Sequence, residues 1–163
     1  SMALLASAHR YVGGELVTAG GTGTYDINTV ANEIQAGSYL LMDTAYAKLD
    51  LPFVHALTVL ATVISVNPAG WAVADCGLKA LGMDHGDPSL APAAPGEAAG
   101  AVWFCSDEHV TFSPGEGTSL PVVGDRVRLL PAHIDPTVAY HQQVYLADGD
   151  DIVEAWPVDL RGW

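Results

Sequence analysis

The sequence predicts a mainly β fold of the α+β class, and three observations support this prediction. After residue 43, short apolar runs rich in β-branched residues alternate with turns built from Gly, Pro and Asn. Residues 3–12 form a short amphipathic helical pattern. Half of the 163 residues are hydrophobic and 15% are charged. The chain is therefore long and apolar enough for one domain, or for one domain and part of another.

The N-terminal region combines a helix, a glycine-rich turn and two apolar runs. The helix over 3–12 ends at Gly13-Gly14, and its early start suggests that a preceding element is missing. Short strands are expected over 15–19 and 33–43. The first leads into a turn of the kind that binds anions through backbone N–H groups, although its spacing fits neither a P-loop nor the dinucleotide fingerprint. An ordinary glycine-rich connection is the alternative. The turn consists of Gly20, Gly21, Thr22, Gly23 and Thr24.

The rest of the chain is expected to form strands joined by turns. Residues 56–66 are apolar and β-branched, as in a central strand buried on both faces. The turn at 67–70 predicts a hairpin with residues 71–76. Residues 84–100 contain three prolines and predict a surface loop. Further strands are expected at 101–105, 110–112, within 121–130, and at 139–146 and 151–158, and a hairpin turn at 148–150 is expected to join the last two.

Charge and cysteine content exclude several classes of partner. Lys plus Arg number 6 against 19 for Asp plus Glu, for a net charge of −13. A chain this acidic is not expected to bind nucleic acid or an anionic membrane surface. It also lacks an apolar run near the roughly 20 residues of a membrane helix. Cys76 and Cys105 show no CxxC spacing, so we expect two reduced, buried thiols in a cytoplasmic protein.

A candidate metal-binding stretch lies at residues 131–137, where His133 and Asp135 stand between Pro131 and Pro136. Proline fixes φ and disfavours helix, so we expect this stretch to be extended. In an extended chain, residues i and i+2 point to the same face, which places an imidazole beside a carboxylate. A divalent ion would fit between them. Two ligands fall short of a complete site, and a strand end with two solvated polar residues is the alternative.

Six segments in this order resemble the D-threonine aldolase and D-serine dehydratase-like family. Its members are pyridoxal-phosphate enzymes with the alanine-racemase type of fold, and the resemblance covers their C-terminal portion only. The segments are 19–25, 33–39 with Met42-Asp43, 61–65, 75–80, 106–109, and 124–128 through 131–137.

The resemblance implies a domain organisation and a set of site residues. Residues 3–43 would be the last units of a cofactor-binding (β/α)8 barrel, and 44–163 a C-terminal β domain with a metal site. The turn at 20–24 would hold the cofactor phosphate. His133 and Asp135 match the family's metal pair. The dehydratase branch has cysteine as its second ligand, whereas Asp135 resembles the aldolase branch and suits Mn²⁺ or Mg²⁺ better than Zn²⁺.

The implied function is that of a metal-activated, pyridoxal-phosphate-dependent D-threonine aldolase-like lyase. Such an enzyme cleaves small D-3-hydroxy amino acids to glycine and an aldehyde. D-serine dehydratase or amino-acid racemase chemistry within the family is one alternative. A stand-alone, non-catalytic β-rich binding domain is the other.

No catalytic residue is expected in this chain. The family's Schiff-base lysine lies near the start of the barrel, and Lys48 and Lys79 fall in segments that match other parts of the family pattern. The chain alone is therefore expected to be inactive. Because a cut barrel exposes strand edges, we expect residues 3–43 to pair with the missing barrel portion or a second copy, in a homo-oligomer, or to rearrange against the β domain.

Other histidines carry weaker signals. His109 beside Asp107 and Glu108 is either an acid–base cluster or a polar hairpin turn. His85, within Asp84-His85-Gly86-Asp87, would supply further ligands or line a pocket mouth, although the loop composition favours plain exposure. His55 and His141 are expected in strands.

Overall fold

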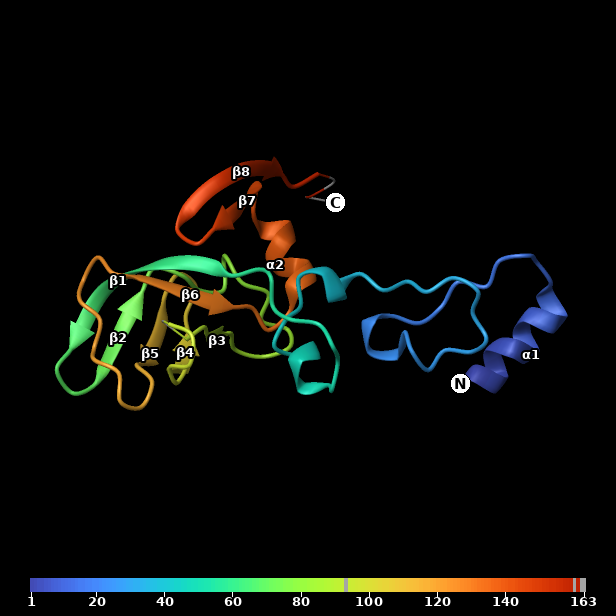
Figure 1. Ribbon diagram of the computed structural model, residues 1–163, viewed down its shortest axis with the longest axis horizontal. Coiled ribbons are helices and arrows are strands. Elements are labelled where there is room, and N and C mark those ends of the chain that lie inside the picture. The colour runs from blue at the N-terminus through green and yellow to red at the C-terminus, as the bar shows by residue number, and fades with distance from the viewer. Residues whose placement is uncertain (93, 160, 162–163) are drawn as a thin grey trace.

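A computed structural model describes residues 1–92, 94–159 and 161. It places the N-terminal third of the chain beside a β-rich body, with the first helix farthest from the sheet (Figure 1). The two α-helices are α1 (Met2–Val12) and α2 (Ile134–Tyr140). The strands are β1 (Val59–Asn67), β2 (Trp71–Ala74), β3 (Ser89–Leu90), β4 (Ala101–Cys105), β5 (Val110–Ser113), β6 (Arg126–Leu130), β7 (Gln143–Asp148) and β8 (Asp151–Pro157). The predicted mainly β, α+β class is confirmed.

Helix α1 confirms the helix predicted over 3–12. It ends at Gly13, whose φ of 78° lies in the left-handed region that glycine adopts without steric cost. None of its residues is buried. The helix therefore leaves apolar side chains exposed, including Leu4 and Val12.

The predicted strands over 15–19 and 33–43 form only one isolated bridge. Thr18 pairs with Glu33 in parallel, and the Ala19 N–H donates to the Glu33 carbonyl at 3.1 Å. Parallel pairing of successive segments is the arrangement of neighbouring barrel strands. The expectation of a strand over 33–43 was wrong. The chain turns through a short 3₁₀ helix at Ser38–Leu40 and then enters the β body, where Met42 and Asp43 are buried.

Six strands form an antiparallel sheet in the order β3-β6-β1-β2-β5-β4. The edge strands β3 and β4 also lie against each other, so the sheet curls toward a closed barrel. Its inner face carries the hydrophobic core, which includes Val63, Leu81, Phe112 and Leu129. The predicted hairpin is confirmed: the Gly70 N–H donates to the Asn67 carbonyl at 3.0 Å, and β1 pairs with β2.

Strand β1 is central in the sheet but is not buried on both faces as predicted. Ala61 and Val63 point into the core, whereas Leu60 and Ile64 remain 58% and 43% exposed. Since side chains alternate along a strand, one face of β1 packs inward and the other lies on the outer surface of the curled sheet.

Two other boundaries differ from expectation. The loop over 84–100 contains the short strand β3, which pairs with β6 through Ser89 and Leu90. Residues 139–146 were predicted as a strand, but residues 139 and 140 belong to the end of α2 and the strand β7 starts only at Gln143. It then joins β8 in a separate two-stranded sheet. Among the described residues, no helix has the length and hydropathy needed to cross a membrane.

Candidate metal centre

His133 lies where β6 ends and α2 begins. Pro131 and Ala132 are buried, and the Thr44 N–H donates to the Pro131 carbonyl at 3.0 Å. His133 itself has extended φ and ψ of −140° and 121°, and it forms an antiparallel bridge with Gly82. The backbone that carries the imidazole is thus fixed by two separate segments of the chain.

The prediction that residues 131–137 are extended throughout was wrong, because α2 starts at Ile134. Pro136 is the third residue of the helix, where the missing N–H costs nothing, since first-turn amides have no intrahelical acceptor. Side chains of the first turn lean toward the helix N-terminus. Asp135 therefore reaches back to His133, and its Oδ2 lies 3.4 Å from His133 Nε2.

Two buried polar side chains hold the start of α2. Asp43 is fully buried and accepts the Ile134 N–H at 3.0 Å through Oδ2 and the Tyr46 N–H at 2.8 Å through Oδ1. Thr137 is fully buried, accepts the Gly82 N–H at 2.8 Å and donates to the His133 carbonyl at 2.7 Å. A side chain at Gly82 would collide with the Pro136 ring. These contacts fix α2 against the Gly82 segment.

Replacing Thr137 by valine is expected to lower the free energy of unfolding by about 1–3 kcal/mol. The variant keeps the shape of the side chain but leaves the buried Gly82 N–H without an acceptor. Urea denaturation measures the change. Thr29→Val, at an exposed threonine, is the control and should alter stability little. Equal stabilities of Thr137→Val and the parent chain would contradict the role given to this hydroxyl.

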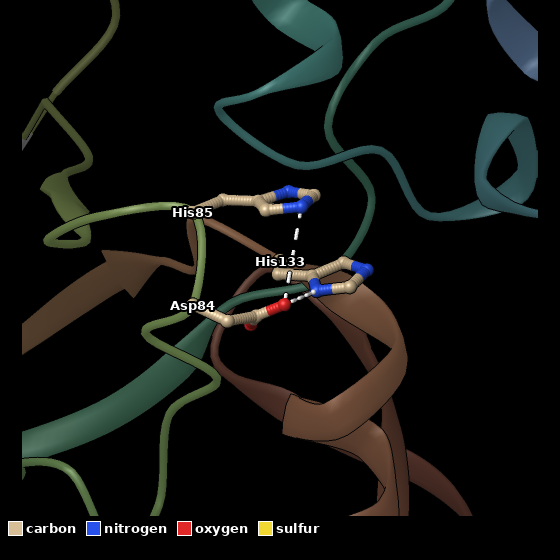
Figure 2. A group of neighbouring side chains, drawn as sticks. All are labelled: Asp84, His85 and His133. Carbon is tan, nitrogen blue, oxygen red and sulfur yellow. Dashed lines mark hydrogen bonds and ion pairs between the residues drawn. The ribbon is translucent and has the colours of Figure 1, made fainter.

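Figure 2 shows Asp84, His85 and His133 gathered at one place. Asp84 Oδ2 lies 2.7 Å from His133 Nδ1 and 3.9 Å from His85 Nε2. One donor atom from each of the three residues lies within 4.8 Å of the others. The hydrogen bond from His133 lowers the pKa of Asp84, and the positive charge of a protonated His133 or His85 adds to this. Asp84 is therefore a carboxylate at neutral pH.

Ring orientation separates two ways in which these groups would hold an ion. The rings of His85 and His133 are stacked, with centroids 4.1 Å apart and planes 10° from parallel. Imidazole lone pairs lie in the ring plane, so two stacked rings do not direct them to one point. The second way, with Nε2 of His133 and Oδ2 of Asp135 as the two donors, fits better. Two donors about 2.1 Å from one ion are roughly 3.0–3.4 Å apart, and Nε2 and Asp135 Oδ2 are 3.4 Å apart.

The structure thus brings the predicted pair His133 and Asp135 together and adds Asp84 and His85. The sequence raised the stretch Asp84-His85-Gly86-Asp87 as a source of further ligands, but its loop composition favoured plain exposure and no spacing linked it to His133. Their placement depends on the bridge between Gly82 and His133. The His133 side chain is 23% exposed, so an ion bound there would stay open to solvent.

The predicted phosphate turn at 20–24 fits an anion only through its backbone. The Gly21 N–H donates to Thr24 Oγ1 at 3.2 Å, and the Thr24 N–H donates to the Gly21 carbonyl at 3.0 Å. The Thr22 side chain is buried and accepts the Tyr39 N–H at 3.1 Å. The threonine hydroxyls therefore support the turn, and a phosphate would have to meet its backbone amides.

The remaining candidates have structural explanations. His109 closes the turn between β4 and β5, where its carbonyl accepts the Ser106 N–H at 2.8 Å. Lys79 is exposed and paired with Glu108, whose carboxylate raises the pKa of the lysine. His55 and His141 lie outside the strands, contrary to expectation; His141 Nε2 is 2.9 Å from the Ala80 carbonyl.

The two cysteines are free thiols. Burial, followed by the negative charges of Cys105 and Asp75, raises the pKa of Cys76 to about 12. Burial and then the charge of Asp87 raise the pKa of Cys105 to about 11. Both thiols are therefore protonated at neutral pH and poorly suited to bind a metal ion or attack a substrate.

Comparison with known proteins identifies the family. The model of the putative serine dehydratase domain matches residues 56–147, which include β1 to β6 and the whole candidate metal centre. The chain belongs to this family. A D-threonine aldolase of Arthrobacter sp is 32% identical over 156 residues, which cover 91% of this chain and 40% of that protein. The chain thus spans less than half the length of this curated relative.

Solved structures agree with the assignment. The crystal structure of D-threonine aldolase from Filomicrobium marinum has a TM-score of 0.79 and 34% identity, over 96% of this chain and 44% of that one. A D-threo-3-hydroxyaspartate dehydratase mutant, solved in its metal-free form, has a TM-score of 0.74 and 25% identity, over 97% of this chain and 48% of that one. This member of the serine dehydratase domain family therefore shares its fold with both aldolases and dehydratases.

Proposed function

We propose that this chain is the C-terminal, metal-binding portion of a D-threonine aldolase-like lyase. The whole enzyme would cleave D-3-hydroxy amino acids to glycine and an aldehyde. The observation that carries the proposal is the pair of His133 Nε2 and Asp135 Oδ2, held 3.4 Å apart at the N-terminus of α2. The identity of 32–34% to two D-threonine aldolases supports the choice of reaction.

In this proposal, His133 and Asp135 would hold a divalent ion, and the rest of its coordination would be left to solvent or substrate oxygen. One nitrogen and one carboxylate oxygen favour Mn²⁺ or Mg²⁺ over Zn²⁺, because a thiolate is absent from the pair. The ion, when bound, lowers the pKa of a coordinated hydroxyl group. The chain's part would be to hold this ion for the substrate's β-hydroxyl, and the partly exposed His133 leaves it accessible.

The turn formed by Gly20, Gly21, Thr22, Gly23 and Thr24 is the proposed holder of the phosphate of pyridoxal phosphate. Backbone amides in such a turn bind phosphate oxygens without needing a cationic side chain. Pyridoxal phosphate, when bound, supplies the electron sink for breaking the Cα–Cβ bond. The lysine that anchors it would come from the preceding part of the barrel, which residues 3–43 would complete, while residues 44–163 carry the metal.

The 163-residue chain, supplied with pyridoxal phosphate, MnCl₂ and D-threonine, is expected to release neither glycine nor acetaldehyde. A chimaera tests the positive part of the proposal. This chain would replace the corresponding C-terminal portion of the Filomicrobium marinum aldolase, which shares its fold. Mn²⁺-dependent cleavage of D-threonine by the chimaera, and its loss in the His133→Ala version, would support the proposal. Turnover by the isolated chain would contradict the missing-lysine argument.

Dehydration of a D-3-hydroxy amino acid is the second candidate, because the matching family and one related structure are both described as dehydratases. The same chimaera separates the two. An aldolase releases glycine from D-threonine, whereas a dehydratase releases ammonia and a 2-oxo acid from D-serine or D-threonine. Asp135 at the second ligand position favours the aldolase.

A further inference from the structure

His133 lies between two carboxylates, and each approaches a different ring nitrogen. Asp84 Oδ2 is 2.7 Å from Nδ1, and Asp135 Oδ2 is 3.4 Å from Nε2. The first distance is that of a strong, charge-assisted hydrogen bond. The second is too long for a good hydrogen bond but suits two donors on one ion. The two carboxylates therefore have different relations to the ring.

The bond to Asp84 selects one tautomer of His133. A carboxylate only accepts hydrogen bonds, so Nδ1 must carry the proton. In a neutral imidazole the lone pair is then on Nε2, the nitrogen that faces Asp135. Metal-binding histidines are commonly held in this way, with one nitrogen on the ion and the other donating to a carboxylate.

Backbone contacts on both sides of Asp84 hold this residue in place. Asp84 is two residues after Gly82, whose backbone pairs with His133 and donates to Thr137. Between them, Met83 packs against the core, and its carbonyl accepts the Gly86 N–H at 3.1 Å. Asp84 therefore stands at the start of a closed turn anchored to the same backbone as His133.

His85 restricts the ring from a third direction. It stacks on the face of His133 at a centroid distance of 4.1 Å, as Figure 2 shows. A stacked ring limits rotation of His133 about its side-chain bonds, while the bond to Asp84 sets which edge points to Asp135. If the ring flipped and turned Nδ1 toward the ion, the stack would remain but the bond to Asp84 would be lost, so Asp84 is the contact that selects the edge.

We infer that Asp84 is a positioning residue for the metal site: it holds His133 as the Nδ1–H tautomer and directs Nε2 toward an ion shared with Asp135. This inference rests on the proposed function, because it takes His133 and Asp135 as the ligand pair. It adds a residue whose role is to orient a ligand rather than to bind the ion. Removal of such an outer partner typically weakens metal binding about 10- to 100-fold.

The test measures Mn²⁺ binding to the 163-residue chain by isothermal titration calorimetry and the tautomer of His133 by ¹⁵N NMR of the metal-free chain near pH 8. Asp84→Ala is expected to raise the Kd for Mn²⁺ about 10- to 100-fold and to move His133 toward the Nε2–H tautomer. Asp84→Asn retains an uncharged acceptor and should lose less affinity while keeping Nδ1–H. Asp87→Asn removes the same charge from the same loop and is the matched control.

Each outcome decides the matter. Parent-like Mn²⁺ affinity and an unchanged tautomer in Asp84→Ala would overturn the inference. If Asp135→Ala loses Mn²⁺ binding in the same experiment, the proposed ligand pair His133 and Asp135 would still stand. Complete loss in Asp84→Ala with retained binding in Asp135→Ala would make Asp84 a ligand itself, which also overturns it. If Asp84→Ala fails to fold, the Asp84→Asn chain decides: an affinity and tautomer equal to those of Asp87→Asn overturn the inference, and a selective loss of affinity supports it.

Discussion

Alanine at His133 or at Asp135 is expected to reduce Mn²⁺ affinity by roughly 100-fold or more, because removing a ligand costs more than the 10- to 100-fold of an outer partner. Asp135→Ala should lower metal affinity without unfolding the chain, since Asp135 is an exposed residue of the first turn of α2. Calorimetric titration of the chain with MnCl₂ measures it, and thermal unfolding shows whether each variant remains folded.

Matched controls make this result specific. His109→Ala removes an exposed histidine from the turn between β4 and β5, and Asp148→Asn removes an exposed carboxylate near the tip of the C-terminal hairpin. Both should bind Mn²⁺ as the parent chain does. If the two ligand variants also bind as the parent does, the ion is held elsewhere and the proposed pair is wrong.

Replacing Asp43 by alanine is expected to lower the free energy of unfolding by about 3 kcal/mol. Its buried carboxylate accepts the Ile134 N–H at 3.0 Å and the Tyr46 N–H at 2.8 Å. Hydrogen bonds to a charged group contribute about 1.5–3 kcal/mol each, and their loss leaves two N–H groups without acceptors. Because Ile134 is the first residue of α2, the carboxylate also favours the positive end of the helix.

Urea denaturation of Asp43→Ala measures this loss, and Asp50→Ala, at an exposed aspartate in the neighbouring segment, is the control. Asp43→Asn keeps one carbonyl acceptor and is expected to lose about half as much stability. Mn²⁺ affinity should fall in Asp43→Ala as well, since Asp43 fixes the start of the helix that carries Asp135. A fully stable Asp43→Ala chain would show that α2 needs no cap from this segment.

The local patterns predicted most of the strands. Turn residues at 67–70 and the glycine of the turn at 148–150 place two hairpins correctly, because such turns are set by the conformational range of a few neighbouring residues. Prediction failed where packing decided the outcome. Leu60 and Ile64 stay exposed in an apolar strand, and Pro136 enters a helix because it falls in the first turn.

By itself, the sequence determined the mainly β class, because strands and turns follow from local composition and spacing. The family, and His133 with Asp135 as the candidate metal pair, came from the resemblance of six segments to known enzymes, while the spacing of the two residues only made the pair possible. Only the tertiary structure decided what surrounds that pair. Asp84 is 49 residues from His133 along the chain, and Asp43 is 91 residues from Ile134. No spacing rule links residues so far apart. They meet because Gly82 pairs with His133 and because the chain leaving the N-terminal segment is buried against α2.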